Sequence, residues 1–146
     1  LFISMLGPVE AVAAQTAKRV LDLPTGDVVT VQFKFQSGST GFIGAISSTP
    51  YYGRFTVFGD QIWVEARDDS HPQHGGKTHL ITCRKDGVQH SQTFPAKDPV
   101  RANLEEWADA VTNGTPYRFQ DEQRIGNVAV LEAIAKSVQS GAWETV

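Results

Sequence analysis

The sequence predicts an α+β domain with one large, mainly antiparallel β-sheet and helices on one face of that sheet. The first observation is a series of short segments between residues 9 and 94 that are rich in β-branched and aromatic residues and end at turn-forming residues. The second is a change of period after Pro99, where apolar residues begin to recur every three or four positions. Strands followed by helices are typical of the α+β class.

Seven strands are expected in the first part of the chain: residues 9–16, 27–36, 40–48, 54–58, 61–67, 78–84 and 88–94. The clearest is 27–36, because alternate positions from Val29 to Phe35 are apolar and would share one face. The segments Ser37–Ser39, Gly59-Asp60 and Lys85–Gly87 have the residue types of tight turns. Such short connections indicate antiparallel pairing.

The two ends of the chain also carry local signals. Residues 1–6 are predicted to be the last turns of a helix, because Gly7 suits a helix stop and Pro8 prevents continuation. We therefore expect that this sequence is a piece of a longer protein and that it begins within a helix. Residues 143–146 are expected to form a short terminal strand.

Two longer helices are predicted after the strands. The first begins after Pro99, ends at Asn113-Gly114, and is expected to use Trp107 as its anchor in the core. The second runs from about Asp121 to Ser140 and is stopped by Gly141. Its predicted buried face consists of apolar residues at three- and four-residue steps: Ile125, Val128, Leu131, Ile134 and Val138.

Composition limits the classes of partner. With 146 residues and a formal net charge of −3, the chain is long enough for one folded domain, and its basic residues form no stripe, so nucleic acid is not expected as a partner. No apolar stretch is long enough to span a membrane. Cys83 is the sole cysteine, which fits a reducing compartment, and we expect a cytoplasmic protein.

Several motifs, in this order along the chain, together carry a resemblance to a known family. They are Gly7-Pro8-Val9 with Val12-Ala13-Ala14, Phe35-Gln36-Ser37-Gly38 with Gly41, Val57-Phe58-Gly59-Asp60, Ala108-Asp109-Ala110-Val111 with Asn113-Gly114-Thr115-Pro116, and Leu131-Glu132-Ala133-Ile134 with Ser137 and Ser140-Gly141. This arrangement resembles the C-terminal domain of the Gfo/Idh/MocA family, the relatives of glucose–fructose oxidoreductase and inositol dehydrogenase.

The resemblance implies a two-domain enzyme. An N-terminal Rossmann domain would bind NAD or NADP, a lysine in a Glu-Lys-Pro motif would assist catalysis, and a histidine in an H-x-x-D motif would transfer the proton. The matching positions would all precede Leu1, because the chain has no G-x-G-x-x-G, no Glu-Lys-Pro and no histidine before His71. We therefore expect no Rossmann domain, cofactor-binding residue or catalytic residue in this chain, which should be inert alone. The resemblance also implies a homodimer or tetramer formed through the sheet face.

The candidate substrate-binding residues lie at two places. Tyr51, Tyr52 and Arg54 follow Pro50 at the start of a predicted strand, and phenol and guanidinium groups suit hydroxyl and carboxylate recognition. The alternative is that the tyrosines pack on the sheet and Arg54 is solvated. Lys18 and Arg19, in the loop after the first strand, are weaker candidates.

Other reactive residue types favour structural roles. His71 and His74 lie in a Gly-rich loop without the ligand spacing of a zinc site, so no metal is expected. Cys83 lies within a predicted strand and is interpreted as a structural thiol. The acidic pairs Asp68-Asp69 and Glu105-Glu106 are interpreted as solvated surface.

Two hypotheses of function follow from the sequence. The first is the substrate-binding and oligomerisation domain of an NAD(P)-dependent oxidoreductase acting on a sugar, polyol or related hydroxy compound. The alternative is a stand-alone, non-catalytic α+β module for binding or assembly that shares the fold.

Overall fold

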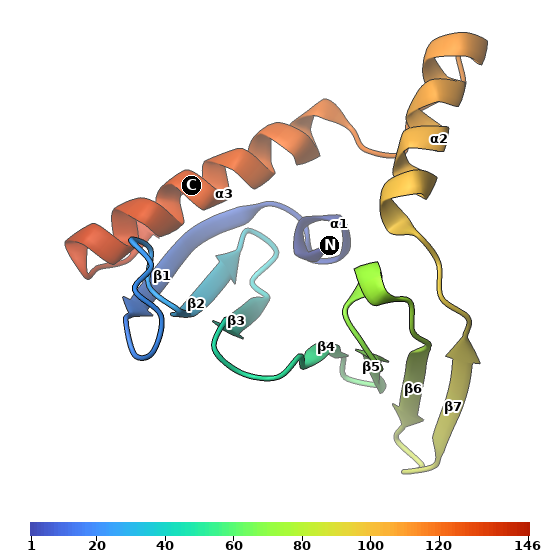
Figure 1. Cartoon of the computed structure of the whole chain (residues 1–146), viewed down its shortest axis with the longest axis horizontal. Coiled ribbons are helices and arrows are strands. Elements are labelled where there is room, and N and C mark those ends of the chain that lie inside the picture. Colours follow the sequence, from blue (N-terminus) through green and yellow to red (C-terminus); the bar gives the residue numbers. More distant parts are fainter. The chain divides into compact units, whose positions relative to one another are not determined.

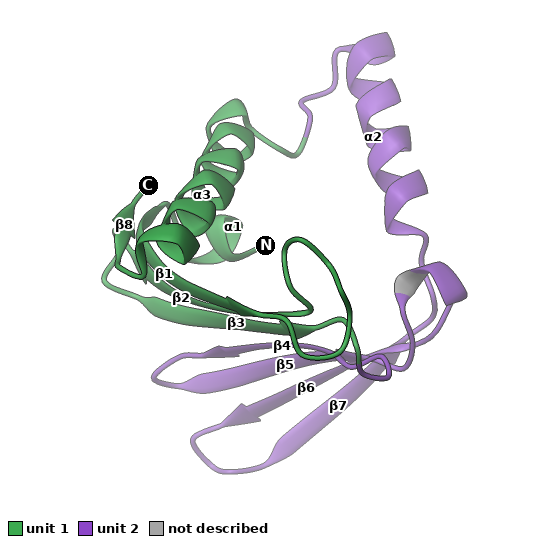
Figure 2. Cartoon of the chain, turned by 60° about the vertical axis from the view of Figure 1, so that its left-hand side comes forward, with its two compact units in different colours: residues 1–48, 118–146 green, residues 49–117 purple. Residues whose placement is uncertain are grey.

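The chain folds as two compact units in the computed structural model (Figures 1 and 2). The structure describes the backbone of residues 1–146 and every side chain except that of Pro72. The first unit consists of Leu1–Ser48 and Arg118–Val146, and the second of Thr49–Tyr117. Each unit contains its own four-stranded antiparallel sheet. The α+β class with antiparallel pairing is confirmed, and the strands are divided between two sheets where the sequence predicted one.

The first unit contains six elements: α1 (Phe2–Leu6), β1 (Val9–Ala17), β2 (Val28–Phe35), β3 (Thr40–Ile46), α3 (Asp121–Ser140) and β8 (Glu144–Thr145). Its sheet has the order β3-β2-β1-β8. The predicted helix end at residues 1–6 is present, and Gly7 ends it with φ +86°. The short terminal strand is also confirmed, because β8 pairs with β1.

The helix α3 lies over one face of this sheet (Figure 2). The predicted apolar face of β2 is confirmed, since Val31, Phe33 and Phe35 are all buried. Phe2 of α1 packs edge-on against Phe33 and Phe35, with ring centroids 5.5 and 6.3 Å apart. The buried cluster combines residues of β1, β2 and α3: Val9, Val12, Ala14, Val31, Phe33, Phe35, Val130 and Ala133.

The buried face of α3 differs from the predicted one. The residues facing β1 are spaced i, i+3, i+4, i+7 and i+8: Val130, Ala133, Ile134, Ser137 and Val138. Only the last two apolar positions of the predicted face belong to this stripe, and Ile125, Val128 and Leu131 are exposed. The prediction was wrong because it counted apolar residues alone, whereas small Ala133 and polar Ser137 are among the buried residues of the helix.

The second unit contains β4 (Gly53–Phe58), β5 (Ile62–Asp68), the 3₁₀ turn η1 (Pro72–His74), β6 (Thr78–Arg84), β7 (Gln89–Phe94) and α2 (Pro99–Asn113). Its strands follow one another in the order β4-β5-β6-β7. The predicted turns at Gly59-Asp60 and Lys85–Gly87 join β4 to β5 and β6 to β7, and a longer loop with η1 joins β5 to β6. Among the described side chains of this unit, only Glu65 and Cys83 are buried. This sheet is therefore held by its backbone ladder and by polar contacts more than by an apolar core.

The helix α2 has the predicted ends but not the predicted anchor. The carboxylate of Asp98 accepts hydrogen bonds from the N–H groups of Val100 and Arg101, and Gly114 ends the helix with φ +68°. Trp107 is 53% exposed, so the expectation that it anchors α2 in the core was wrong. The helix buries none of its residues. None of the helices in the described part of the chain has the length and apolar composition that a membrane crossing requires.

Candidate functional site

The predicted substrate-binding cluster lies at the start of β4 and is divided between the two faces of its sheet. Paired positions of antiparallel strands share a face, and successive residues alternate between faces. Arg54 pairs with Arg67, whereas the preceding Gly53 pairs with Asp68. Arg54 therefore lies on the face of Arg67, and Asp68 lies on the opposite face. Tyr52 is hydrogen-bonded to Arg54 on the first face, and Tyr51 to Asp68 on the second. The three candidates therefore do not form one group.

On the first face, Arg54 is the centre of a polar triad. Its Nε donates to Glu65 Oε2 at 2.5 Å, and its Nη1 donates to the hydroxyl of Tyr52 at 2.9 Å. The Glu65 side chain is only 11% exposed, and the hydrogen bond and charge that it offers raise the pKa of Arg54. Because Arg67 lies directly opposite Arg54, Glu65 also compensates a like-charge pair across the strands. The interpretation of Arg54 as a merely solvated residue is thus replaced by an ion pair.

On the second face, Tyr51 and Thr78 meet the carboxylate of Asp68. The hydroxyl of Thr78 donates to Asp68 Oδ1 at 2.6 Å. Partial burial, and then the charge and hydrogen bond of Asp68, raise the pKa of Tyr51, so its phenol remains a donor. The phenol folds back over Gly53, where an added Cβ would lie 2.0 Å from the Tyr51 hydroxyl. The prediction that Asp68 is solvated surface was wrong, because these two donors hold it half-buried.

Asp68 and Thr78 also line a pocket of about 420 Å³ in the second unit. The remaining lining comes from the β5–β6 connection and from the segment between β7 and α2: Ser70, Gly76, Phe94, Pro95, Ala96, Lys97 and Pro99. Sequence reasoning missed Glu65, Thr78 and Lys97. Their signal was weak, because each is an ordinary polar residue. The partners of Glu65 and Thr78 lie ten or more residues away along the chain, and Lys97 is marked only by its place in the pocket lining.

Lys18 and Arg19 lie in a loop that the buried carboxylate of Asp27 holds in place. Asp27 is 2% exposed and accepts hydrogen bonds from the N–H groups of Arg19, Val20 and Leu21, at 2.7 to 3.1 Å. The Arg19 N–H, opposed by burial and aided by the other N–H groups, lowers the pKa of Asp27 to about 2. The side chain of Lys18 pairs with Asp22 at 2.5 Å on the surface. The hydrogen bonds to Asp27 therefore hold the backbone of this loop in place, while a substrate role for Lys18 and Arg19 stays a prediction.

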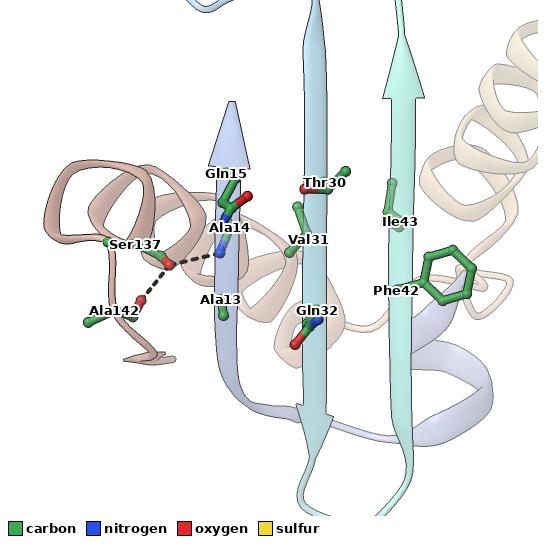
Figure 3. A pocket seen from close by; sticks show the side chains of 11 residues that line it. Ala13, Ala14, Gln15, Thr30, Val31, Gln32, Phe42, Ile43, Ser137 and Ala142 are labelled. Carbon is green, nitrogen blue, oxygen red and sulfur yellow. Dashed lines mark hydrogen bonds between the residues drawn. The ribbon is translucent and has the colours of Figure 1, made fainter. Parts of the chain in front are cut away.

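The first unit has a pocket of about 330 Å³ where α3 meets the sheet (Figure 3). Its walls include Ser137, whose hydroxyl accepts from the Ala14 N–H at 2.9 Å and donates to the Ala142 carbonyl at 2.6 Å. Ala14 lies on β1 beyond the two residues that β8 pairs, so Ser137 takes the place of the missing strand partner. These bonds use the hydroxyl hydrogen of Ser137 and one of its two lone pairs, and they give the residue a structural place. The sequence offered Ser137 only as part of a family motif, without this role.

The remaining reactive residues form no cluster of metal ligands in the described part of the chain. No set of three His, Cys, Asp or Glu side chains is close enough there to hold a metal ion. The ring of His71 lies against Tyr51, with centroids 5.7 Å apart, and His79 Nε2 is 2.8 Å from Asp69 Oδ1. Cys83 is a buried free thiol, as expected for a structural residue.

The described residues also do not fit a nicotinamide dinucleotide. Pyrophosphate sites need N–H groups left free at a helix N-terminus that follows a parallel strand. The paired strands here are antiparallel, the N-terminus of α2 is occupied by the Asp98 carboxylate, and that of α3 by the Gln120 capping box.

Solved structures share this fold. A protein from Desulfitobacterium hafniense, assigned as an NADPH-dependent oxidoreductase, is 22% identical with a TM-score of 0.80 over 99% of this chain and 44% of its own. The WlbA dehydrogenase from Bordetella pertussis, solved with NADH and UDP-GlcNAcA, is 17% identical with a TM-score of 0.74 over 100% of this chain and 43% of its own. The aldose-aldose oxidoreductase from Caulobacter crescentus, solved with glycerol, is 21% identical with a TM-score of 0.73 over 95% and 42%.

The chain thus spans less than half the length of each of these proteins. At these identities the likeness establishes the fold. The family follows from a match to the family described as "Oxidoreductase family, C-terminal alpha/beta domain", which covers residues 1–146. The chain belongs to the Gfo/Idh/MocA oxidoreductases, as their C-terminal domain.

Proposed function

We propose that this chain is the substrate-binding and oligomerisation domain of an NAD(P)-dependent oxidoreductase that acts on a sugar, polyol or related hydroxy compound. In this proposal a Rossmann domain on the N-terminal side supplies the cofactor site and the catalytic base. The observation that carries the proposal is the family match over residues 1–146, together with a domain that offers polar side chains but no dinucleotide cradle among its described residues.

The neighbouring structures support the division of labour in this proposal. The WlbA dehydrogenase was solved with NADH and a UDP-sugar acid, and the Caulobacter enzyme with glycerol. Each contains a region that this chain matches and a larger remainder. By analogy, the remainder holds the cofactor and the matched domain contributes side chains that orient the substrate. The buried free thiol of Cys83 fits a cytoplasmic protein.

Tyr52 and Arg54 are the proposed hydroxyl- and carboxylate-binding residues of this domain. The Nε of Arg54 donates to Glu65, and its Nη1 donates to the Tyr52 hydroxyl. The Nη2 group is therefore left to donate to a substrate oxygen. Glu65 thereby fixes the guanidinium plane before substrate arrives, which lowers the entropic cost of binding. Tyr51 would act on the other face of the sheet, through Asp68.

The sheet face of the first unit that α3 leaves open is the proposed surface for a homodimer or tetramer. Phe42 and Ile46 are 77% and 53% exposed, and by register they share this face with Lys34. Lys34 Nζ lies 4.4 Å from the ring centroid of Trp143. Exposed aromatic and aliphatic residues among polar neighbours are typical of protein interfaces. Sedimentation at micromolar concentration should give at least twice the monomer mass, and a strictly monomeric mass would contradict this part.

The coding region upstream of Leu1 tests the proposal first. A G-x-G-x-x-G unit followed by Glu-Lys-Pro and H-x-x-D is the expected finding. The full-length protein should then oxidise or reduce a sugar or polyol with NAD(H) or NADP(H). Arg54→Ala should raise the KM of that reaction with little change in kcat, whereas Arg67→Ala, on the same face, should leave both unchanged. A start codon directly before Leu1 would favour the stand-alone binding or assembly module instead.

A further inference from the structure

The pocket of the second unit has a lining that discriminates between ligands. We propose that it binds a polyhydroxy acid, such as a sugar acid, with the carboxylate at Lys97 and the hydroxyls at Asp68, Thr78 and Ser70. This inference rests on the proposed function and goes beyond it. The pocket lies on the Asp68 face of the sheet, opposite the face of Tyr52 and Arg54, and is therefore a second ligand site of the domain, selective for hydroxy compounds that also carry a carboxylate.

Lys97 provides the positive end of the pocket. It is the only basic residue of the lining, and it has no ion pair or side-chain hydrogen bond among the described residues. The adjacent N-terminus of α2 does not compete for an anion, because the Asp98 carboxylate already accepts from Val100 and Arg101. An unpaired ammonium group is therefore the group at which a ligand carboxylate would bind.

The part of the pocket lining formed by Asp68, Thr78 and Ser70 is rich in hydrogen-bond acceptors. An ionised carboxylate accepts about four hydrogen bonds, and Thr78 and Tyr51 supply two to Asp68. Thr78 donates its only hydroxyl hydrogen to Asp68, and Ser70 donates its hydroxyl hydrogen to the Gly75 carbonyl at 2.7 Å. The hydrogen-bonding capacity that these side chains leave unused consists of lone pairs, so a bound group must donate hydrogen bonds to them. Hydroxyl groups do so, whereas a phosphate dianion has no hydrogen to donate.

The size and the apolar part of the lining fit a sugar-sized ligand. A volume of about 420 Å³ lies within the usual range of small-molecule sites. Phe94, Pro95, Ala96 and Pro99 form the non-polar part of the wall, on which the C–H face of a sugar ring can pack. Gly76 keeps the loop close to Ser70, because a Cβ there would lie 2.5 Å from Ser70 Oγ.

Titration of the full chain with three probes, followed by amide NMR shifts, tests this inference. D-glucuronate should shift the amides of Ser70, Thr78 and Lys97 and bind about tenfold more tightly than neutral D-glucose, as one added charge-assisted hydrogen bond implies. Acetate, which lacks the hydroxyls, should bind more weakly than D-glucuronate. Lys97→Met should lower the affinity for D-glucuronate to that for D-glucose and leave D-glucose binding unchanged. Asp68→Asn should weaken both.

Lys85→Met is the matched control, because Lys85 lies in the β6–β7 turn at the far end of β6 from Thr78. Equal affinities for D-glucuronate and D-glucose, or a Lys97→Met chain that binds D-glucuronate as the wild type does, would overturn the inference. If D-glucose shifts the amides of Tyr52 and Arg54 while D-glucuronate leaves the pocket unmoved, the inference fails and the proposed function stands. Failure of the proposed function has a separate readout, which is a start codon directly before Leu1 in place of a region that encodes a Rossmann domain.

Discussion

The two units of the chain use opposite means to order a four-stranded antiparallel sheet. In the first unit α3 covers one sheet face, and the fully buried residues, Phe35 and Val12 among them, lie between helix and sheet. In the second unit only Glu65 and Cys83 are buried among the described side chains, and polar residues on both sheet faces satisfy one another. Stability therefore concentrates in the first unit, while the second presents the side chains suited to binding hydroxyl and carboxylate groups.

Replacing Phe35 should give the largest effect, because it is 1% exposed and packs with Phe33 and Phe2. Phe35→Ala should lower the free energy of unfolding by about 3–5 kcal/mol, as expected for a buried phenylalanine. Phe58→Ala is the control, since Phe58 of β4 is also a phenylalanine, is 77% exposed, and its loss should cost less than about 0.5 kcal/mol. Urea unfolding followed by circular dichroism measures both. Equal losses in the two variants would refute the placement of the core.

Ser137 should give the next largest effect. Ser137→Ala removes the partner of the Ala14 N–H and of the Ala142 carbonyl, at a residue that is 0% exposed. An unsatisfied buried polar group costs about 1–3 kcal/mol, and we expect a loss in that range. Hydrogen exchange at the Ala14 amide should accelerate as well. Ser140→Ala removes two exposed bonds, the one donated to Glu144 and the one accepted from the Ala142 N–H, and should change neither quantity measurably. Unchanged exchange at Ala14 in Ser137→Ala would contradict the assigned bond.

The sequence was sufficient to predict the elements because their signals are local. The alternation from Val29 to Phe35 identified both β2 and its buried face, and the turn residues between strands identified the hairpins. The buried face of α3 was missed because it depends on Ser137, a polar residue whose hydrogen bonds join it to β1 and to the turn after the helix. The prediction for Trp107 failed for a related reason. An apolar stripe in the sequence of a helix does not show which surface, if any, the helix packs against, and α2 buries none of its residues.

The candidate site was less predictable than the fold. Tyr51, Tyr52 and Arg54 were identified as neighbours in the sequence, but β-strand alternation places their contacts on opposite sheet faces. Their partners, Glu65 and Asp68, become visible only with the strand register, because each lies more than ten residues away along the chain. Residue type alone therefore suggested a plausible chemistry but not which side chains act together.

The Arg54–Glu65 pair tests whether polar contacts hold the second unit. Arg54→Met should destabilise this unit, because it leaves the carboxylate of Glu65, whose side chain is 11% exposed, without its partner. Adding Glu65→Leu should restore part of the loss, since removing both polar groups also removes the unsatisfied charge. Hydrogen exchange of β5 amides reports the effect, with β2 amides as the reference in the first unit. Arg67→Met, on the same face, should be nearly silent, and a loss as large as that of Arg54→Met would sink the ion-pair interpretation.

The smallest expected effect is a pH dependence confined to the loop of the first unit that Asp27 organises. The folded-state pKa of Asp27, about 2, lies below its ordinary value of 3.8, chiefly because the Arg19 N–H donates to it. A group with a depressed pKa stabilises the fold fully above its ordinary pKa, and that contribution disappears as pH falls through the folded value. Wild type should therefore be more stable than Asp27→Asn at neutral pH, and the gap should close between about pH 4 and pH 2. Urea midpoints across this range measure the gap, with Asp22→Asn as the control because its side chain is 95% exposed. A gap that stays constant down to about pH 2 would mean that shape, and not the charge of the carboxylate, orders the loop.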